Sequence, residues 1–366
     1  MGILDTIIHT KQTESRADFK ASDVVKELLA ELKDRDRQIL MHRYGLGGQA
    51  TKTLAAIGSE QNLTRERVRQ IEKDLLKALR KAGAKSENFG RAKEFLIDII
   101  AEHGRIIAEE NLLLQLNVSD QQEKNAIVFL LHLIEELENF IHDNYKKSWV
   151  TVLFNQDLLH KFAAESGKIL DSRKRPLPTE EFLQNFKETD FYRQNQNELT
   201  DKVIVNFLEL AVGIEKNVFG SWGLAYWKEI TPKDVGDKAY LVMKHHGKPE
   251  HYSVITEMIN KQKFDSRTAY KETVHNELIK DPRFILIGRG IYALSEWGYK
   301  PGVVADVIAN ILKSAGKPMG RDQIIEEVLK HRLVKKNTIL VGLSNKKMFR
   351  KVGKNTYALA ETRPSA

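Results

Sequence analysis

The sequence contains no cysteine and no apolar run of the roughly 20 residues that a transmembrane helix needs. Without thiols the chain forms no disulfide and no thiolate metal site, which is typical of proteins kept in a reducing cytoplasm. The first residues also lack the basic and then apolar segments of a signal peptide. We therefore expect a cytoplasmic protein without membrane contact.

The sequence also lacks the residue patterns of common catalytic and cofactor sites. The glycines of Gly45–Gly48 are not followed by the Lys-Ser or Lys-Thr pair of a phosphate-binding loop. His245, His246 and His251 are close in sequence, but no His-x-x-x-His helix and no cysteine accompanies them. Packing or surface positions are therefore the more typical interpretation. We predict no catalytic residue, no metal and no cofactor, and we expect that the protein is not an enzyme.

The charge is unevenly distributed along the 366 residues, a length that predicts two to four domains. Residues 31–85 hold 13 basic and 7 acidic side chains, and residues 300–360 hold 13 and 4. Between them, residues 91–232 hold 16 basic and 23 acidic side chains. The basic ends favour contacts with phosphates, whereas the acidic middle favours a spacer or a protein-binding body.

The segment Leu63–Arg80 predicts an amphipathic helix that begins after an N-cap at Thr64. Apolar residues recur at spacings of three and four along one face: Val68, Ile71, Leu75, Leu76 and Leu79. The opposite face carries Arg65, Glu66, Arg69, Gln70 and Lys73. Arg pairs with guanine and Gln with adenine in the major groove, so this face suits base reading. The alternative is a solvated charged face.

Two shorter helices are expected before this segment, one ending at Gly45 and one over Leu54–Gly58. Two helices, a turn with glycine and a capped basic helix form the layout of a helix-turn-helix. The sequence here resembles the fourth region of housekeeping-type bacterial sigma factors. The resemblance rests on L-x-x-R-x-R-x-I-L-x-x-R-Y-G-L at 32–46, T-L-x-x-I-G at 53–58 and T-R-E-R-V-R-Q-I-E at 64–72.

This resemblance implies that the helix reads a −35-type promoter element in double-stranded DNA, with core RNA polymerase as a partner. The positions that correspond to base-reading ones are Arg65, Glu66, Arg69 and Gln70. The expected DNA backbone contacts are Arg35, Arg43, Thr53, Leu54, Thr64, Arg67 and Lys73, with Thr53 and Leu54 acting through the main chain. Sigma factors grip polymerase and melt DNA with a second region that is absent here. We therefore expect a protein that is not a self-sufficient initiation factor.

Four related segments are expected after a linker at 83–90, each with helices followed by a β-rich end. In each segment the first expected helix ends at a glycine that is followed by Lys or Arg, and a second helix comes next. These glycines are Gly104, Gly167, Gly247 and Gly316. We name them the first (91–154), second (155–232), third (233–299) and fourth (300–361) repeats. Helices with a C-terminal hairpin predict winged helices. The predicted fold is mainly α with small β-hairpin wings: an arm at 1–22, a helix-turn-helix at 23–82 and an array of winged helices.

The third repeat resembles the HARE-type winged helix, which also occurs in the delta subunit of bacterial RNA polymerase. The matching segments are AYLVMKHHGKPEHYSVITEMI at 239–259 and TVHNELIKDPRFILIGRGIYAL at 273–294. The helix expected at Tyr270–Lys280 has mixed charge, so it is a poor candidate for phosphate contact.

The fourth repeat is strongly basic, and Asn345–Val352 is expected to be a basic recognition helix entering its wing. The second basic patch predicted here comprises Lys335, Lys336, Lys346, Lys347, Arg350, Lys351 and Lys354. Nucleic acid is the expected partner, and a solvated basic surface is the alternative. The tryptophans near the β-rich ends are expected to be packing anchors: Trp149, Trp222, Trp227 and Trp297.

Together these features predict a sigma-like, RNA polymerase-associated transcription factor. One alternative is a sequence-specific regulator that acts without polymerase and uses the second basic patch as another DNA clamp. A further alternative is an architectural or interaction protein whose helix-turn-helix no longer reads bases.

Overall fold

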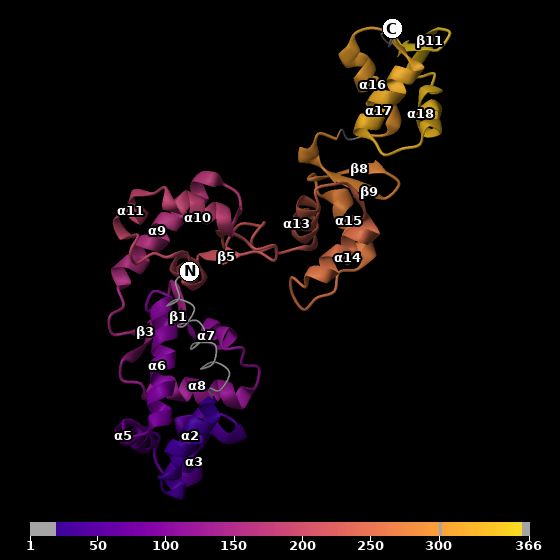
Figure 1. Ribbon diagram of the computed structural model, residues 1–366. Helices are drawn as coiled ribbons and strands as arrows, with labels where there is room; N and C mark the ends of the chain where they lie inside the picture. Colours follow the sequence, from indigo (N-terminus) through magenta and orange to yellow (C-terminus); the bar gives the residue numbers. More distant parts are fainter. Residues whose placement is uncertain (1–19, 300–301, 361–366) are drawn as a thin grey trace. The chain divides into compact units, whose positions relative to one another are not determined.

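The computed structural model of the protein describes residues 20–299 and 302–360. It is built mainly from helices with short antiparallel strands, which agrees with the predicted mainly α fold with small β-hairpins (Figure 1). The chain divides into two compact units, residues 1–215 and 216–366. The arm predicted at 1–22 lies outside the described residues up to residue 19, and helix α2 begins at Ala21. Within the described ranges, no helix is long and apolar enough to cross a membrane.

The first unit begins with the predicted helix-turn-helix. Its elements are α2 (Ala21–Ala30), α3 (Asp34–Tyr44), the 3-10 helix η1 (Leu46–Gly48), α4 (Leu54–Gln61) and α5 (Arg65–Gly83). Gly45 ends α3 in the left-handed conformation at φ 65°, as expected. Thr53 and Thr64 cap α4 and α5 by accepting the N–H groups of Ala56 and Arg67. The cap at Thr64 and the helix end at Gly45 are therefore confirmed, whereas the expected end of the second helix at Gly58 is wrong, because α4 continues to Gln61 and Asn62 ends it in the left-handed conformation.

The first repeat follows directly. The prediction of a linker at 83–90 is wrong, because α5 extends to Gly83 and α6 already begins at Glu87. Its elements are α6 (Glu87–Glu102), β1 (Ile106–Ala108), α7 (Glu109–Gln115), α8 (Gln121–Leu133), β2 (Leu137–His142) and β3 (Tyr145–Thr151). Ser86 caps α6 by accepting the N–H of Phe89, and a Cβ on Gly83 would lie 2.7 Å from the ring of Phe89. Gly83 is thus a packing position, and only residues 84–86 separate α5 from α6.

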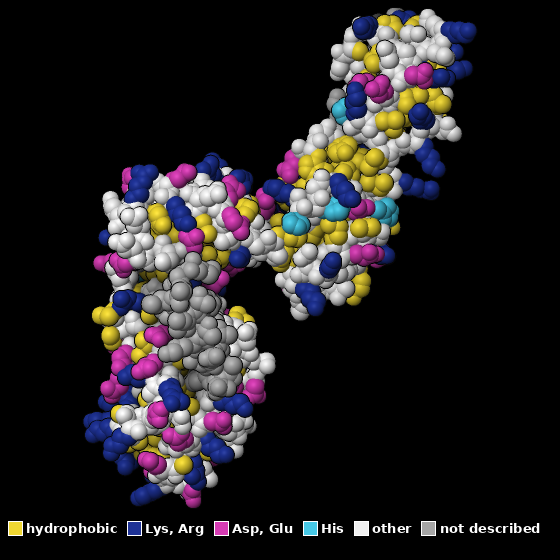
Figure 2. Space-filling view, in the orientation of Figure 1, with side chains coloured by type: hydrophobic (Ala, Val, Ile, Leu, Met, Phe, Trp, Pro, Cys, Tyr) yellow, Lys and Arg dark blue, Asp and Glu magenta, His cyan; other side chains and the backbone are white. Residues whose placement is uncertain are grey.

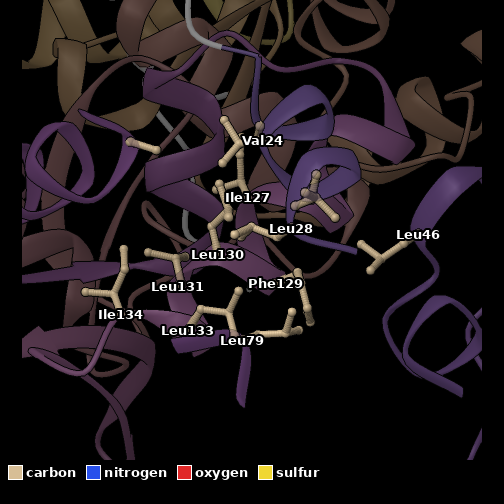
Figure 3. Packing of buried hydrophobic residues seen from close by; sticks show 14 of the residues in the cluster. Val24, Leu28, Leu46, Leu79, Ile127, Phe129, Leu130, Leu131, Leu133 and Ile134 are labelled. Carbon is tan, nitrogen blue, oxygen red and sulfur yellow. The ribbon is translucent and has the colours of Figure 1, made fainter. Parts of the chain in front are cut away.

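The helix-turn-helix and the first repeat share one hydrophobic core, in which α8 packs against α2, α3 and α5 (Figure 3). The buried side chains of α8 point to several sides: Ala126, Ile127, Phe129, Leu130, Leu131 and Leu133. Tyr44 on α3 packs edge-on against Phe129 with ring centroids 4.9 Å apart. Arg80 on α5 donates to the carbonyl oxygen of His132 at 2.9 Å. The first repeat therefore packs directly against the helices of the helix-turn-helix, including α5.

The remaining elements of the first unit belong to the second repeat. They are α9 (Gln156–Arg173), β4 (Leu177–Pro178), α10 (Thr179–Lys187), α11 (Asp190–Asn195), α12 (Asp201–Leu210) and β5 (Ile214–Lys216), within which the units divide. Gly167 lies inside α9, so its prediction as a helix end is wrong, and Lys174 at φ 52° ends this helix. Gly104, by contrast, has φ 80° and lets α12 approach, because a Cβ there would lie 2.7 Å from Val203.

The second unit contains β6 (Ser221–Leu224) and two sets of elements in the same order as the first repeat. The third repeat has α13 (Val235–His246), β7 (Glu250–His251), α14 (Tyr252–Gln262), α15 (Lys271–Lys280), β8 (Phe284–Gly288), β9 (Ile291–Leu294) and the 3-10 helix η2 (Ser295–Trp297). The fourth has α16 (Val304–Ala315), β10 (Met319–Gly320), α17 (Arg321–His331), α18 (Lys336–Leu343), β11 (Phe349–Gly353) and β12 (Thr356–Leu359). In each sheet the last strand lies between the other two, in the orders β7-β9-β8 and β10-β12-β11, as in β1-β3-β2.

The recognition helix predicted at Asn345–Val352 is wrong. Helix α18 ends at Leu343, and β11 already begins at Phe349. Between them the side-chain oxygen of Asn345 accepts the N–H of Lys347 at 3.1 Å, a local bond that competes with helix continuation. The helix next to the β11–β12 hairpin is therefore α18, and the lysines that follow it lie in a turn and on the hairpin.

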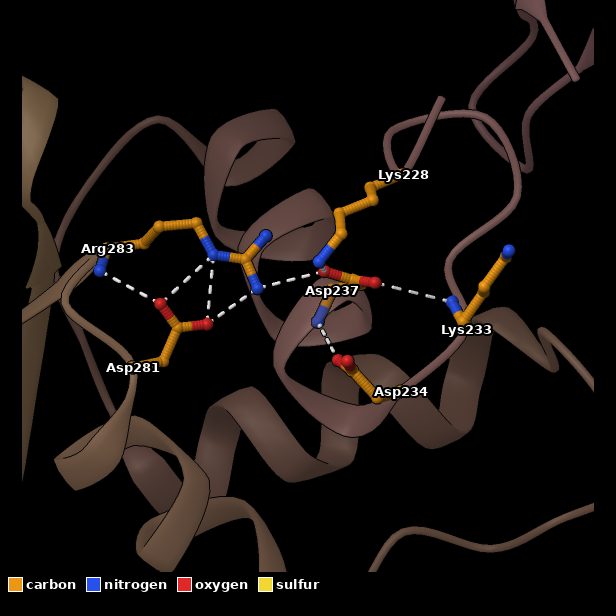
Figure 4. A network of polar contacts seen from close by, with 6 residues as sticks. All are labelled: Lys228, Lys233, Asp234, Asp237, Asp281 and Arg283. Atoms are coloured by element: carbon orange, nitrogen blue, oxygen red, sulfur yellow. Dashed lines mark hydrogen bonds and ion pairs between the residues drawn. The ribbon is translucent and has the colours of Figure 1, made fainter. Parts of the chain in front are cut away.

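A polar network holds the first turn of α13 to the loop between α15 and β8 (Figure 4). The carboxylate of Asp237 is almost fully buried, and it contacts Nη2 of Arg283 at 2.9 Å and Nζ of Lys228 at 3.4 Å. Arg283 also pairs with Asp281 at 2.6 Å. Burial disfavours the ionised form of Asp281, but hydrogen bonds from Arg283 outweigh it and lower the pKa of Asp281. Two cations thus compensate the buried carboxylate.

The tryptophans expected to anchor the β-rich ends differ in burial. Trp149 and Trp222 are each 1% exposed. Trp227 and Trp297 are half-buried. The indole N–H of Trp149 donates to Glu109 at 2.9 Å, which ties β3 to the start of α7. Trp149 and Trp222 therefore act as the expected packing anchors.

Candidate nucleic-acid interface

The turn between α4 and α5 depends on a glycine at position 58. The N–H of Leu63 donates to the carbonyl oxygen of Gly58 at 2.8 Å, and Asn62 adopts φ 53°. A Cβ on residue 58 would lie only 2.6 Å from the carbonyl oxygen of Leu63, closer than real Cβ contacts. Gly58 therefore sets how closely α5 follows α4.

Helix α5 separates its side chains as its sequence predicts. Val68, Ile71, Leu75 and Leu79 are buried, and Leu76 is partly buried against the same core. The exposed side chains at its start are Arg65, Glu66, Arg67, Arg69, Gln70 and Lys73. Figure 2 shows Lys and Arg side chains gathered over the part of the molecule that carries α5. All four candidate base-reading residues therefore lie on the accessible face of one helix.

Pairs along α5 already orient these side chains. Arg69 donates to Glu66 through Nε at 2.9 Å and Nη2 at 2.7 Å, and Arg67 donates to Oε1 of Gln70 at 3.3 Å. The hydrogen bond from Arg69 lowers the pKa of Glu66. Because both partners are exposed, solvent screens this pair and bases can replace it.

The candidate backbone contacts are differently placed. Arg43 contacts Glu72 with Nε and Oε1 3.2 Å apart, and the hydroxyl of Tyr44 donates to the same oxygen at 2.9 Å. Burial, with the neighbouring Glu72, raises the pKa of Tyr44. These contacts join α3 to α5, so Arg43 has a structural partner. Arg35 is exposed, with Asp36 3.9 Å away.

The start of α4 presents main-chain donors. The hydroxyl of Thr53 accepts the N–H of Ala56 at 3.2 Å and caps the helix. The N–H groups of Leu54 and Ala55 belong to the first turn, where a helix provides no internal acceptor. Thr53 is exposed and Leu54 is half-buried. Such a helix start is suited to a phosphate oxygen.

The second basic patch lies in the other unit, around α18. Lys335 directly precedes α18 and Lys336 begins it. Lys346 and Lys347 lie in the turn after the helix, Arg350 and Lys351 on β11, and Lys354 in the hairpin turn. All these side chains are exposed. The sequence has no acidic residue from Leu329 to Ala360.

Sequence reasoning missed the exposed face of α18 itself. Val341 is 70% and Leu340 36% exposed, and Lys336, Asn337 and Ser344 are exposed on the same face. Ile339 and Leu343 are buried on the other. The spacing 336, 337, 340, 341, 344 was a detectable signal, because residues four apart share one side of a helix. A recognition helix expected at 345–352 leaves these residues out.

The three histidines near α13 have local contacts. His245 stacks on Phe219 with ring centroids 3.9 Å apart, and His251 lies 2.7 Å from the hydroxyl of Ser253. His246 is 3.3 Å from Glu250. Over residues 20–299 and 302–360, no three potential ligands gather in a way that could hold a metal ion.

Comparison with known proteins defines the class of the first domain. Residues 28–81 match the family Sigma-70, region 4, so this segment is a sigma-70 region 4 helix-turn-helix domain. The chain is also similar to the RNA polymerase sigma factor RpoD of Helicobacter pylori (strain ATCC 700392 / 26695), at 40% identity over 77 residues. That match covers 21% of this chain and 10% of RpoD. A domain of this class points to DNA binding in transcription.

Proposed function

We propose that the protein is a sigma-like, RNA polymerase-associated transcription factor that reads promoter-type DNA with the helix Thr64–Arg80. The observation that carries this proposal is the exposed start of α5 in a region 4 domain. Arg65, Glu66, Arg69 and Gln70 all lie there, opposite the buried face. In the major groove, Arg69 would exchange Glu66 for guanine, Gln70 would pair with adenine and Glu66 would accept from cytosine.

The residues around the helix would position it on the DNA backbone. Thr53 and Leu54 would use the start of α4, while Arg35, Thr64, Arg67 and Lys73 would approach from neighbouring exposed positions. Arg43 remains a predicted contact, although its guanidinium is already paired with Glu72. Contacts of this kind fix orientation rather than sequence preference.

We further infer that the four repeats are winged helices, with a HARE-type module at 233–299. The shared element order and the position of the last strand in the centre of each sheet at β1-β3-β2, β7-β9-β8 and β10-β12-β11 support this assignment. The acidic residues 91–232 would face protein, and core RNA polymerase is the proposed partner. The likeness of the first domain to part of RpoD supports that choice.

The second candidate function is a sequence-specific regulator, or an architectural DNA-binding protein, that acts without RNA polymerase. The exposed basic surface around α18 favours it, because such a surface provides phosphate contacts independent of the region 4 domain.

Selection of binding sites from random duplexes, with and without core polymerase, tests the proposal. The full chain is expected to enrich a defined sequence, and capture of core polymerase separates the first function from the second. Arg69→Ala should abolish part of the enriched motif, whereas Lys81→Ala, at an exposed position in the last turn of α5, should preserve it. Uniform binding by the wild-type chain would refute base reading.

A further inference from the structure

The last helix of each repeat, which precedes its final two strands, has a different environment in each. In the first repeat this helix is α8, and it is buried against the helix-turn-helix. In the second repeat the helix before the last two strands is α12, whose Asn206 is 3% exposed and donates to the carbonyl oxygens of His103 at 2.8 Å and Ile106 at 2.7 Å. Lys202 on α12 also pairs with Glu102 at 2.6 Å. Both helices join neighbouring parts of the chain, so neither is accessible to a DNA groove.

The third helix of the third repeat, α15, is accessible but carries mixed charge. Lys271 and Lys280 are exposed, yet Glu272 is exposed on the same helix and Glu277 is half-buried. Carboxylates beside a phosphate backbone repel it and cancel the attraction of the lysines. This helix is therefore unsuited to bind DNA.

Helix α18 of the fourth repeat has the opposite properties. Its exposed face combines Asn337 with the aliphatic side chains of Leu340 and Val341. Lysines precede this face at Lys335–Lys336 and follow it at Lys346–Lys347. Figure 2 shows Lys and Arg side chains beside an apolar area in the part of the chain that carries α18.

We propose that α18 is a second DNA-reading helix, which enters the major groove at sites containing A·T pairs. Val341 and Leu340 contact the methyl groups of thymine, and Asn337 binds the edge of adenine. The lysines on both sides, with Lys351 and Lys354 of the hairpin, contact phosphates. This inference rests on the proposed DNA-binding function of the chain, and it assigns the reading element of the second basic patch.

The composition of the face favours DNA over a protein partner. A stable protein interface takes about 20–30 residues from each side, whereas the exposed face of α18 offers two aliphatic side chains. Lysine is depleted in protein interfaces but is a common phosphate ligand. A short apolar strip framed by cations therefore matches base edges with methyl groups between two phosphate backbones.

The decisive experiment removes the thymine methyl groups from the DNA. The full chain carrying Arg65→Ala and Arg69→Ala, which silence base reading by α5, is titrated with a thymine duplex and with the same duplex containing uracil. The thymine duplex should bind more tightly, by about fourfold for each methyl group contacted. Val341→Ser should remove this preference. Ile279→Ser, a matched control at an exposed position of α15, should retain it.

A second measurement tests the phosphate contacts. Replacing Lys346, Lys347 and Lys351 by glutamine should reduce the slope of log K against log salt by up to about three units. A control that replaces three exposed lysines of the third repeat should leave the slope unchanged; these are Lys261, Lys271 and Lys280.

Equal affinity for thymine and uracil duplexes, together with no effect of Val341→Ser, would overturn the inference. An unchanged salt slope in the Lys346, Lys347 and Lys351 variant would also overturn it. Failure of the region 4 proposal gives a different result, because the sequence enriched by the wild-type chain would then not depend on Arg69. The variants in α5 and in α18 thus report on separate claims.

Discussion

Replacement of Gly58 by alanine tests whether the turn of the helix-turn-helix is set by close packing. Gly58 lies inside α4, where alanine is normally preferred by about 1 kcal/mol. Its added Cβ, however, would lie 2.6 Å from the carbonyl oxygen of Leu63 and 3.4 Å from the carbonyl carbon of Thr64. Both are backbone atoms, so no side-chain rotation relieves the contact.

The two effects have opposite signs, and the contact should win. Overpacking that forces backbone shifts costs about 1–3 kcal/mol, and a contact as short as 2.6 Å with a backbone oxygen places the cost above the helix-propensity gain of about 1 kcal/mol. We expect Gly58→Ala to lower the free energy of unfolding of the first unit by up to about 2 kcal/mol. DNA affinity should fall as well, because the displaced turn carries Arg65 and Arg69 with it.

Urea unfolding followed by circular dichroism measures the change, and Gly90→Ala provides the matched control. Gly90 also lies within a helix, α6, but a Cβ there meets no heavy atom within 4 Å. That variant should therefore gain about 0.5–1 kcal/mol. If Gly58→Ala were stabilised to the same extent as Gly90→Ala, helix propensity would govern the site and the packing argument would be refuted.

Three further predictions concern DNA reading and stability. Arg69→Ala should reduce discrimination between the enriched sequence and random duplex by about 1–3 kcal/mol in competition titrations, and equal loss on both duplexes would contradict base reading. Burial lowers the pKa of His132, which packs 4.8 Å from Trp149 and 5.4 Å from Tyr44, so the folded first unit favours the neutral ring. The stabilisation that this neutral ring contributes to the first unit should be full above a pH of about 6.5 and should decrease as the pH falls below that value. His132→Gln should flatten this pH dependence of the urea midpoint. Arg283→Met leaves the buried Asp237 with Lys228 alone and should destabilise the second unit by up to about 3 kcal/mol; recovery by the added change Asp237→Asn would confirm that charge compensation is the cause.

The features that the sequence predicted correctly are encoded within a few residues. Thr64 caps α5, Gly45 ends α3, and the apolar spacing of Val68–Leu79 defines the buried face of α5. Each depends on backbone geometry or on the helical period, which residues close in sequence determine. Two predictions failed because of contacts that the local pattern does not show. At 83–90, Gly83 is packed against Phe89 instead of forming a linker. At 345–352, the side chain of Asn345 accepts the N–H of Lys347 in a turn where a helix was expected.

The sequence by itself determined the region 4 domain, the residues on the open face of its last helix and the basic character of both ends. Only the tertiary structure decided which of the later helices remain accessible. α8 and α12 are buried by residues far away in the sequence, whereas α18 is left exposed in a segment without acidic residues. The tertiary structure also pairs Arg43 with Glu72, which lies 29 residues further along the chain. Helical periodicity shows that a face is apolar, but only long-range packing determines what covers it.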